Sequence, residues 1–251
     1  INVMEIKELK KVLEEFGDNV KFEHDLKKKN WFNIGGKAKV FFKANNLKEL
    51  VNLLKKINNQ EKIFILGAGS NTLVKDSLYD GIVIKLSKNF NNISLLREDV
   101  IIAGSAVSDK SLSDFAMNNN LSGFEFLSCI PGSIGGGIKM NAGCFGKEFK
   151  DILLSVQAID RLGNVKTTLS KDIDFEYRKN DLPDDLIFLS ASFKGIKGDK
   201  KKISDQIHKL KKEKEKNQPT KIKTSGSTFK NPISQTHKKV WELIKESVPL
   251  D

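Results

Sequence analysis

A glycine-dense segment in the middle of the chain constrains the fold more than any other feature. Residues 130–146 hold six of the 18 glycines within 17 positions, with Lys139 as the single charged residue. Glycine adds no core volume and loses much conformational freedom on folding, so this density favours a backbone that closely approaches a ligand. Bare N–H groups among apolar residues suit a large cofactor with a flat apolar part and a phosphate part.

A second glycine-rich turn, Gly67-Ala68-Gly69-Ser70-Asn71, follows the apolar stretch 62–66. Thr72 stands where a Rossmann fingerprint needs its third glycine, and a strand expected by Gly81 leaves no room for a crossover helix, which disfavours a Rossmann fold. The N–H groups of the turn, with Ser70 Oγ and Asn71 Nδ2, could cradle a pyrophosphate. A tight turn that binds nothing is the alternative, and the first glycine segment as an opposite wall favours phosphate binding.

Hydrophobic periodicity predicts an α+β fold in which strands outnumber helices. Helices are expected at 6–16, with Gly17 placed to end it, at 47–57, with a cap near Asn45 or Asn46, and at 112–118. Strands are expected at 40–43, 62–66, 81–86, 99–103, 153–160, 165–169 and 187–193. We expect domains at residues 1–88, 89–220 and 221–251. About 30 residues cannot bury a core alone. The last segment is therefore expected either to pack on the preceding structure or to continue past Asp251 in the natural protein.

Composition points to a cytoplasmic globular protein, since no run approaches the roughly 18 apolar residues of a membrane span and no signal-peptide core is present. Cys129 and Cys144 are the only cysteines, too few for a disulfide framework. The three histidines and the carboxylates show no metal-ligand spacing, so no metal is predicted and a cofactor should carry any chemistry. Without a long heptad pattern, we expect a monomer.

The net charge of +11 is concentrated in residues 200–223, which carry ten lysines and three acidic residues. Ile203, Ile207 and Leu210 recur there at helical spacing, so the lysines are expected on the solvent side of an amphipathic helix. A surface for an anionic substrate is the second interpretation. A basic nucleic-acid-binding protein is a further alternative, although no arginine and aromatic interleaving accompanies the lysines.

Two polar positions outside the expected core could serve chemistry. Arg178, after Tyr177, offers a fixed guanidinium fork for a carboxylate, and Ser227 lies in a Gly-Ser-Thr turn where it offers a small proton donor. A surface arginine and a turn serine are the alternatives, and on spacing alone these are favoured.

Four segments, in order, resemble the UDP-N-acetylenolpyruvoylglucosamine reductase family, flavoenzymes of peptidoglycan precursor synthesis. They are Trp31-Phe32-Asn33-Ile34-Gly35-Gly36, Leu66 to Asn71, Ile130 to Gly146, and Gly226-Ser227-Thr228-Phe229-Lys230-Asn231-Pro232. The resemblance implies the FAD-binding fold of the vanillyl-alcohol oxidase class, made of two α+β subdomains, plus a substrate-binding domain that is incomplete here. The short stretch between Tyr177 and Pro219 is similar to the compact type, which lacks an inserted substrate loop.

The resemblance also implies an activity, the reduction of UDP-N-acetylglucosamine enolpyruvate to UDP-N-acetylmuramate with FAD and NADPH. Arg178 matches the arginine that stabilises an enolate-like charge, Ser227 matches the serine that protonates the adjacent carbon, and Tyr177, Lys230 and Asn231 match positions near the substrate. The residues matched to FAD binding are Gly67, Ala68, Gly69, Ser70, Asn71, Pro131, Gly132, Ser133, Ile134, Gly135, Gly136, Ala142 and Gly143.

The resemblance has one large departure, because nothing here corresponds to the glutamate that the family places in its C-terminal segment. Glu242 and Glu246 lie on an expected helix too early in the chain to match. An FAD-binding relative without turnover therefore stays an alternative, as does an FAD oxidoreductase of the same fold with another substrate. Asn217 falls where many relatives carry a basic residue, which weakens a phosphate role for that position.

Overall fold

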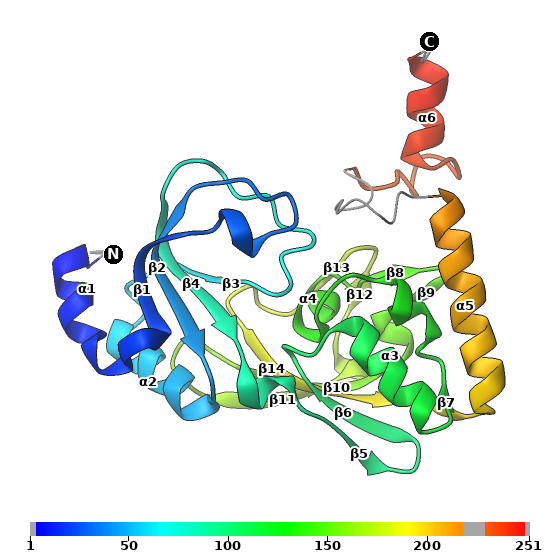
Figure 1. The fold of residues 1–251 in the computed structure, drawn as a ribbon, viewed down its shortest axis with the longest axis horizontal. Helices are drawn as coiled ribbons and strands as arrows, with labels where there is room; N and C mark the ends of the chain where they lie inside the picture. Colours follow the sequence, from blue (N-terminus) through cyan, green and yellow to red (C-terminus); the bar gives the residue numbers. More distant parts are fainter. Residues whose placement is uncertain (1–3, 218–228, 249–251) are drawn as a thin grey trace.

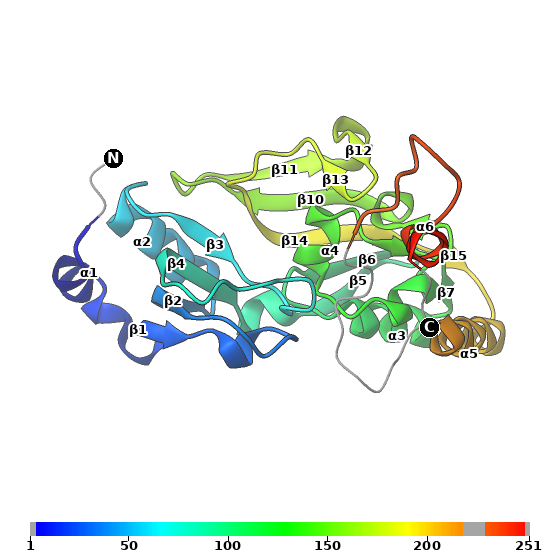
Figure 2. The same ribbon diagram turned by 90° about the horizontal axis from the view of Figure 1, so that it is seen from above.

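Two β-sheets, joined through a shared apolar core, form the body of the protein (Figure 1). The computed structural model describes residues 4–217 and 229–248. The two sheets lie next to each other, with helix α1 at one end of the molecule and helix α5 at the other (Figure 2). The expected α+β class is confirmed.

The first sheet has the strand order β1-β2-β4-β3. Its strands are β1 (Val20–Asp25), β2 (Lys37–Ala44), β4 (Tyr79–Leu86) and β3 (Ile63–Ile65), with β1 antiparallel to β2 and the other pairs parallel. Helix α2 (Leu47–Ile57) links β2 to β3, and Asn46 caps it by accepting from the Glu49 N–H at 2.9 Å, as predicted for a cap near this position.

Two helical segments at the start of the chain replace the single helix expected over 6–16. Helix α1 (Ile6–Val12) stops at Val12 and is followed by the 3₁₀ helix η1 (Glu14–Asn19). The expectation that Gly17 ends the first helix is wrong, because α1 already ends at Val12 with Leu13 as its C-cap. Gly17 instead lies within η1, at φ 50° and ψ −128°, a conformation that suits glycine. Helices α1 and α2 contribute Leu9 and Leu50 to the same apolar core as the first sheet.

The second sheet is antiparallel and has the order β11-β10-β14-β6-β5. Its strands are β11 (Val165–Leu169), β10 (Leu153–Ile159), β14 (Ile187–Lys194), β6 (Val100–Gly104) and β5 (Ile93–Arg97). Helices α3 (Asp109–Asn118) and α4 (Ile134–Lys139) supply Leu112 and Ile138 to its core, so they pack against this sheet. The strands β1 and β5 were not among those predicted from the sequence.

Short elements complete the chain. The two-residue strands pair as β7 (Leu121–Ser122) with β15 (Ile196–Lys197), β8 (Gly143–Cys144) with β9 (Lys147–Glu148), and β12 (Phe175–Glu176) with β13 (Lys179–Asn180). The remaining 3₁₀ helices are η2 (Lys27–Lys29), η3 (Lys88–Asn91), η4 (Glu125–Cys129), η5 (Phe149–Asp151) and η6 (Ser170–Asp172). Helix α5 (Lys200–Asn217) buries Ile203, Ile207 and Leu210, which confirms the predicted amphipathic helix over this part of residues 200–223. Helix α6 (Val240–Ser247) lies near the end of the second described range, after the turns within residues 229–239.

The junction between the sheets is both apolar and polar. Ile159, Ile187 and Leu189 of the second sheet belong to the core cluster that surrounds the first sheet, and they are at most 4% exposed. Arg161 lies in the β10–β11 turn, and its guanidinium donates to Asn59 Oδ1 at 3.0 Å and to the main-chain carbonyl of Glu61. The shared core therefore fixes how the loops at the two sheets face each other.

Truncation of a side chain in the shared core should destabilise the whole protein. We expect Leu189→Ala to lower the free energy of unfolding by about 2–5 kcal/mol, because it opens a cavity between the sheets. Urea unfolding followed by circular dichroism measures this loss. Leu162→Ala, at a turn position that is 71% exposed, is the matched control and should change stability by less than about 0.5 kcal/mol. Equal losses for the two variants would contradict a shared core.

Candidate active site

The two glycine segments predicted as opposite walls of one site lie against each other. Gly67 follows β3 and Ser133 precedes α4, and a Cβ built on Gly67 would lie 2.6 Å from Ser133 Oγ. That oxygen ends a rotatable side chain, and the next nearest atom, Ser133 Cβ, is 3.9 Å away, so rotation of the Ser133 hydroxyl would make room for one methyl group. The contact shows that the two halves of the protein meet at Gly67 and Ser133, where a side chain larger than a methyl group would push the two segments apart.

Neighbouring backbone fixes the shape of the turn at 67–71. Gly69 has φ +71°, and a Cβ there would lie 2.3 Å from the Lys29 carbonyl oxygen. The Trp31 N–H donates to the Gly69 carbonyl at 3.0 Å, and Lys85 Nζ donates to the Gly67 carbonyl at 2.6 Å. The carbonyls of Gly67 and Gly69 are therefore occupied by protein donors. Ser70 is half-buried, and Ala68 and Asn71 are exposed.

The second wall uses its glycines partly for packing. A Cβ on Gly137 would lie 2.3 Å from the Phe149 ring, and the N–H groups of Ile134 and Gly135 already donate to the carbonyls of Val107 and Ser105 at 2.9 Å. The Ile134 side chain is fully buried in the core, so this residue could meet a cofactor only through its backbone. The more accessible members of the predicted set are Pro131, Gly132, Gly135, Gly136, Ala142 and Gly143.

Arg178 is held against the C-terminal part of this wall. It lies with Tyr177 in the turn between β12 and β13, at φ 60°, and its guanidinium carbon is 4.9 Å from the centroid of the Tyr177 ring. The guanidinium donates to the Asn141 carbonyl at 3.3 Å and to the Gly143 carbonyl at 3.0 Å. The structure therefore brings one predicted catalytic residue to the predicted cofactor loop.

Two buried amides hold this arrangement together, and sequence reasoning did not assign them a role. Asn141 Nδ2 donates to Glu148 Oε2 at 3.0 Å and to the Glu176 carbonyl at 3.1 Å. Asn180 Nδ2 donates to the Ile138 carbonyl at 2.9 Å. Both amides tie the β12–β13 turn to the glycine segment. The available signal was that Asn141 is the lone amide within residues 130–146.

A buried carboxyl group lies behind the second wall. Asp109, the first residue of α3, is 0% exposed, and both its carboxyl oxygens lack a hydrogen-bond partner in the described protein. A Cβ on Gly132 would lie 2.4 Å from Asp109 Oδ2, so glycine at 132 makes room for this carboxyl. Burial raises the pKa of Asp109 well above the ordinary carboxyl value.

The cysteines are free thiols, as expected, with Cys129 buried and Cys144 half-buried. Burial, followed by the nearby Cys129, raises the pKa of the Cys144 thiol to about 12. Its Sγ donates to the Phe126 carbonyl at 3.3 Å. Both cysteines therefore act as packing residues beside the glycine segment rather than as nucleophiles.

The two described residues predicted in the C-terminal segment, Lys230 and Asn231, are not brought to Arg178. Ser227 lies outside the described residues. Lys230 is exposed, and Asn231 Oδ1 accepts from the Val240 N–H at 3.0 Å at the start of α6. Residues 229–248 lie beyond the C-terminal end of α5 (Figure 1). Their hydrogen bonds include one from Lys238 to Glu246 and one from Val240 to Asn231, which join residues of this same segment.

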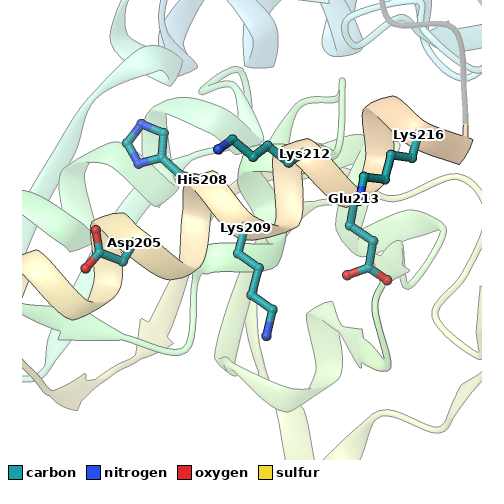
Figure 3. Close-up of a pocket in the computed structure, with 6 residues that line it drawn as sticks. All are labelled: Asp205, His208, Lys209, Lys212, Glu213 and Lys216. Atoms are coloured by element: carbon teal, nitrogen blue, oxygen red, sulfur yellow. The ribbon is translucent and has the colours of Figure 1, made fainter.

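A surface hollow on α5 lies apart from the two walls. Figure 3 shows the side chains that line it, which all come from this single helix: Asp205, His208, Lys209, Lys212, Glu213 and Lys216. A ligand pocket is concave and encloses most of its ligand, which the side chains of one helix face cannot do alone. The hollow therefore fits a solvated lysine-rich helix face, the first of the interpretations made from the sequence.

Within the described residues, no helix is long and apolar enough to cross a membrane, and no three His, Cys, Asp or Glu side chains are grouped to hold a metal ion. Residues 38–169 match the family model described as FAD binding domain. The backbone follows that of p-cresol methylhydroxylase with a TM-score of 0.54 at 17% identity, over 78% of this chain and 45% of that one. The fold and the glycine walls define an FAD-binding protein of the vanillyl-alcohol oxidase class.

More similar proteins narrow the class. UDP-N-acetylenolpyruvoylglucosamine reductase of Pelagibacter ubique is 63% identical over 99% of this chain and 82% of its own length. The crystal structure of the reductase from Thermus caldophilus gives a TM-score of 0.78 at 28% identity, over 91% of this chain and 79% of that one. The chain belongs to the UDP-N-acetylenolpyruvoylglucosamine reductase family, which confirms the resemblance drawn from its motifs.

The contact between Gly67 and Ser133 gives a test of the two-wall site. Gly67→Leu should weaken FAD binding by about tenfold or more, equivalent to at least ~1.4 kcal/mol, because a large side chain at this contact separates the walls. Quenching of FAD fluorescence on titration with apoprotein measures the affinity. Gly67→Ala is the control and should bind FAD nearly as tightly as wild type, because rotation of the Ser133 hydroxyl makes room for one methyl group. Wild-type affinity in Gly67→Leu would contradict the contact.

Asp109 should make stability depend on pH. Because its pKa is raised in the folded protein, ionisation favours the unfolded chain, and stability falls as pH rises from about 3.9, the ordinary carboxyl value, through the raised one. Asp109→Asn lacks this loss, so the variant should gain stability relative to wild type across that window. Urea unfolding of the apoprotein between about pH 4 and pH 8.5 measures the difference.

The control for Asp109→Asn is Asp114→Asn, which removes one carboxyl from the same helix at a half-buried position. It separates the effect of a buried carboxyl from that of one unit of net charge. A stability difference between Asp109→Asn and wild type that stays constant with pH would show that Asp109 has a partner in solution, contrary to its isolation here.

Proposed function

We propose that this protein reduces UDP-N-acetylglucosamine enolpyruvate to UDP-N-acetylmuramate, with FAD as bound cofactor and NADPH as reductant. The observation that carries the proposal is Arg178, which the Asn141 and Gly143 carbonyls hold on the glycine segment that forms one wall of the cofactor site. Family membership supports the same reaction. The substrate is a UDP-sugar enolpyruvyl ether, whose carboxylate an arginine fork suits.

The residues present fit FAD. Gly67 and Gly69 leave a cradle without side chains, in which the turn from Gly67 to Asn71 would hold the diphosphate. Pro131, Gly132, Ser133, Ile134, Gly135, Gly136, Ala142 and Gly143 would form the wall beside the flavin, with Ile134 contributing backbone alone. When bound, FAD supplies hydride transfer between NADPH and the enolpyruvyl carbon.

Arg178 would stabilise the negative charge that develops on the carboxylate side of the substrate. Its two bonds to main-chain carbonyls leave three of the five guanidinium N–H donors for a ligand. The ring of Tyr177 covers one guanidinium face. The distance of 4.9 Å from the guanidinium carbon to the ring centroid fits a cation–π contact. A cation fixed before the substrate arrives needs little reorganisation, which is the requirement for electrostatic stabilisation of a transition state.

Ser227 would donate its hydroxyl proton to the carbon next to the carboxylate. A serine hydroxyl is a weak acid, so this role needs a strongly basic carbanionic partner. Tyr177, Lys230 and Asn231 would contact the substrate, with Lys230 facing phosphate or carboxylate and Asn231 orienting the sugar-nucleotide. Because Asn231 Oδ1 accepts from the Val240 N–H, its amide nitrogen is the group open to a ligand.

The same proposal includes domain limits at 88/89 and 220/221, a monomeric state and a cytoplasmic location. The limit at 88/89 is supported by the two sheets, which occupy residues 20–86 and 93–194. The substrate-binding part would begin at residue 221.

Replacement of Ser227 separates the two half-reactions. Ser227→Ala should slow substrate-driven reoxidation of the reduced protein by about 10²–10⁴-fold, because the proton donor is lost, while reduction by NADPH survives. Stopped-flow absorbance of the flavin measures both rates. Ser225→Ala, two residues earlier, is the control and should leave both rates near those of wild type.

Each failure of this experiment has its own meaning. Equal slowing of both half-reactions in Ser227→Ala would contradict its role as proton donor. Reduction by NADPH without reoxidation by the enolpyruvyl substrate would indicate an FAD oxidoreductase with another substrate, or a relative without turnover. A purified protein that binds no FAD would overturn the proposed function itself.

A further inference from the structure

Two lysines lie at the base of the turn formed by Gly67 to Asn71, and neither has a described acidic partner. Lys85 comes from β4, is half-buried, and donates from Nζ to the Gly67 carbonyl at 2.6 Å. Lys29 is the last residue of η2, and its carbonyl oxygen lies next to Gly69, where it would be 2.3 Å from an added Cβ. Among the ion pairs of the described residues, neither ammonium group takes part.

The surroundings of this lysine pair add positive charge. Burial, followed by the charge of Lys29, lowers the pKa of Lys85, so the two ammonium groups are close enough to repel. Lys29 Nζ lies 5.4 Å from the centroid of the Phe41 ring, whose other contact is the imidazole of His24 at 4.7 Å. Lys43 is the register partner of Lys85 on β2.

An acidic group near this cluster, Asp25, interacts with the His24 end. Burial, followed by the charges of Lys29 and Lys21, lowers the pKa of His24, and Asp25 opposes this shift. Asp25 Oδ1 already accepts from the Lys27 N–H at 2.7 Å. The Lys85 end, which touches the glycine turn, therefore keeps its positive charge directly behind a turn in which Gly67 and Gly69 carry no side chains.

We infer that Lys85 and Lys29 position the glycine turn for an organic diphosphate and supply the charge that attracts it. Lys85 acts through the Gly67 carbonyl, which it holds away from the ligand so that the N–H groups of the turn can face the phosphates. The repulsion between the two ammonium groups is relieved when a diphosphate anion binds nearby. The inference rests on the proposed function, in which FAD brings this diphosphate.

The experiment compares FAD affinity across matched lysine variants of the apoprotein. Lys85→Met should raise the dissociation constant for FAD by about 10- to 100-fold, in line with loss of a charged hydrogen bond. Lys29→Met should raise it by a smaller factor, and Lys85→Arg should stay near wild type because the charge and the donor remain. Lys43→Met, which removes an exposed lysine from the neighbouring strand, should have little effect.

Salt dependence separates a charge role from a merely structural one. FAD binding by wild type should weaken with rising salt, and this slope should be smaller in Lys85→Met and Lys29→Met, since fewer cations lie near the bound phosphates. Circular dichroism and thermal unfolding check that the variants fold. If Lys85→Met does not fold, Lys29→Met and Lys85→Arg carry the test.

Several outcomes would overturn the inference. Wild-type FAD affinity in both Met variants, or weakened affinity with an unchanged salt slope, would contradict it while leaving the proposed function intact. A raised KM for the UDP-sugar substrate at unchanged FAD affinity would assign the lysines to the substrate's diphosphate instead. Absence of FAD binding by wild type would mark failure of the proposed function, and the inference would fall with it.

Discussion

The apolar core shared by the two sheets is the constraint on which the rest of the structure depends. Ile159, Ile187 and Leu189 pack into the cluster of the first sheet, and this packing sets the distance between Gly67 and Ser133. Apolar contacts are not directional, yet a close-packed core admits few relative positions of its parts. The site is therefore shaped by residues that belong to neither wall, and a cavity at the junction would act on both walls together.

Close approach of backbone segments is the second consequence of this packing. Gly67, Gly69 and Gly137 each lie where a Cβ would collide with a neighbouring group. These glycines serve two different purposes, since those at 67 and 69 shape a turn open to a ligand, whereas Gly137 lets Phe149 pack against α4. Glycine density thus marks a place of close approach without stating whether a ligand or a side chain is what approaches.

That ambiguity explains what could and could not be predicted from the sequence. The α+β class, the Asn46 cap and the buried face of α5 follow from local patterns, because each depends on neighbours along the chain. The place of Arg178 depends on contacts 35 and 37 residues away, with Gly143 and Asn141, and no spacing encodes them. Residue type alone suggested a fork for a carboxylate but favoured a surface arginine, and the family motifs then indicated its role. The buried carboxyl of Asp109 gave no sequence signal beyond that of an acidic residue at a helix start.

The same bonding pattern recurs at three cations around the two walls. Arg178 donates to the Gly143 carbonyl, Lys85 to the Gly67 carbonyl, and Lys214 of α5 to the Cys129 carbonyl, next to the second glycine segment. A carbonyl dipole fixes the direction of a cation without neutralising it, whereas a carboxylate would cancel its charge. Most lysines of α5 face solvent, so the net charge of +11 alone says little about function. What matters for an anionic ligand is that the few cations at the walls are oriented by backbone and keep their charge.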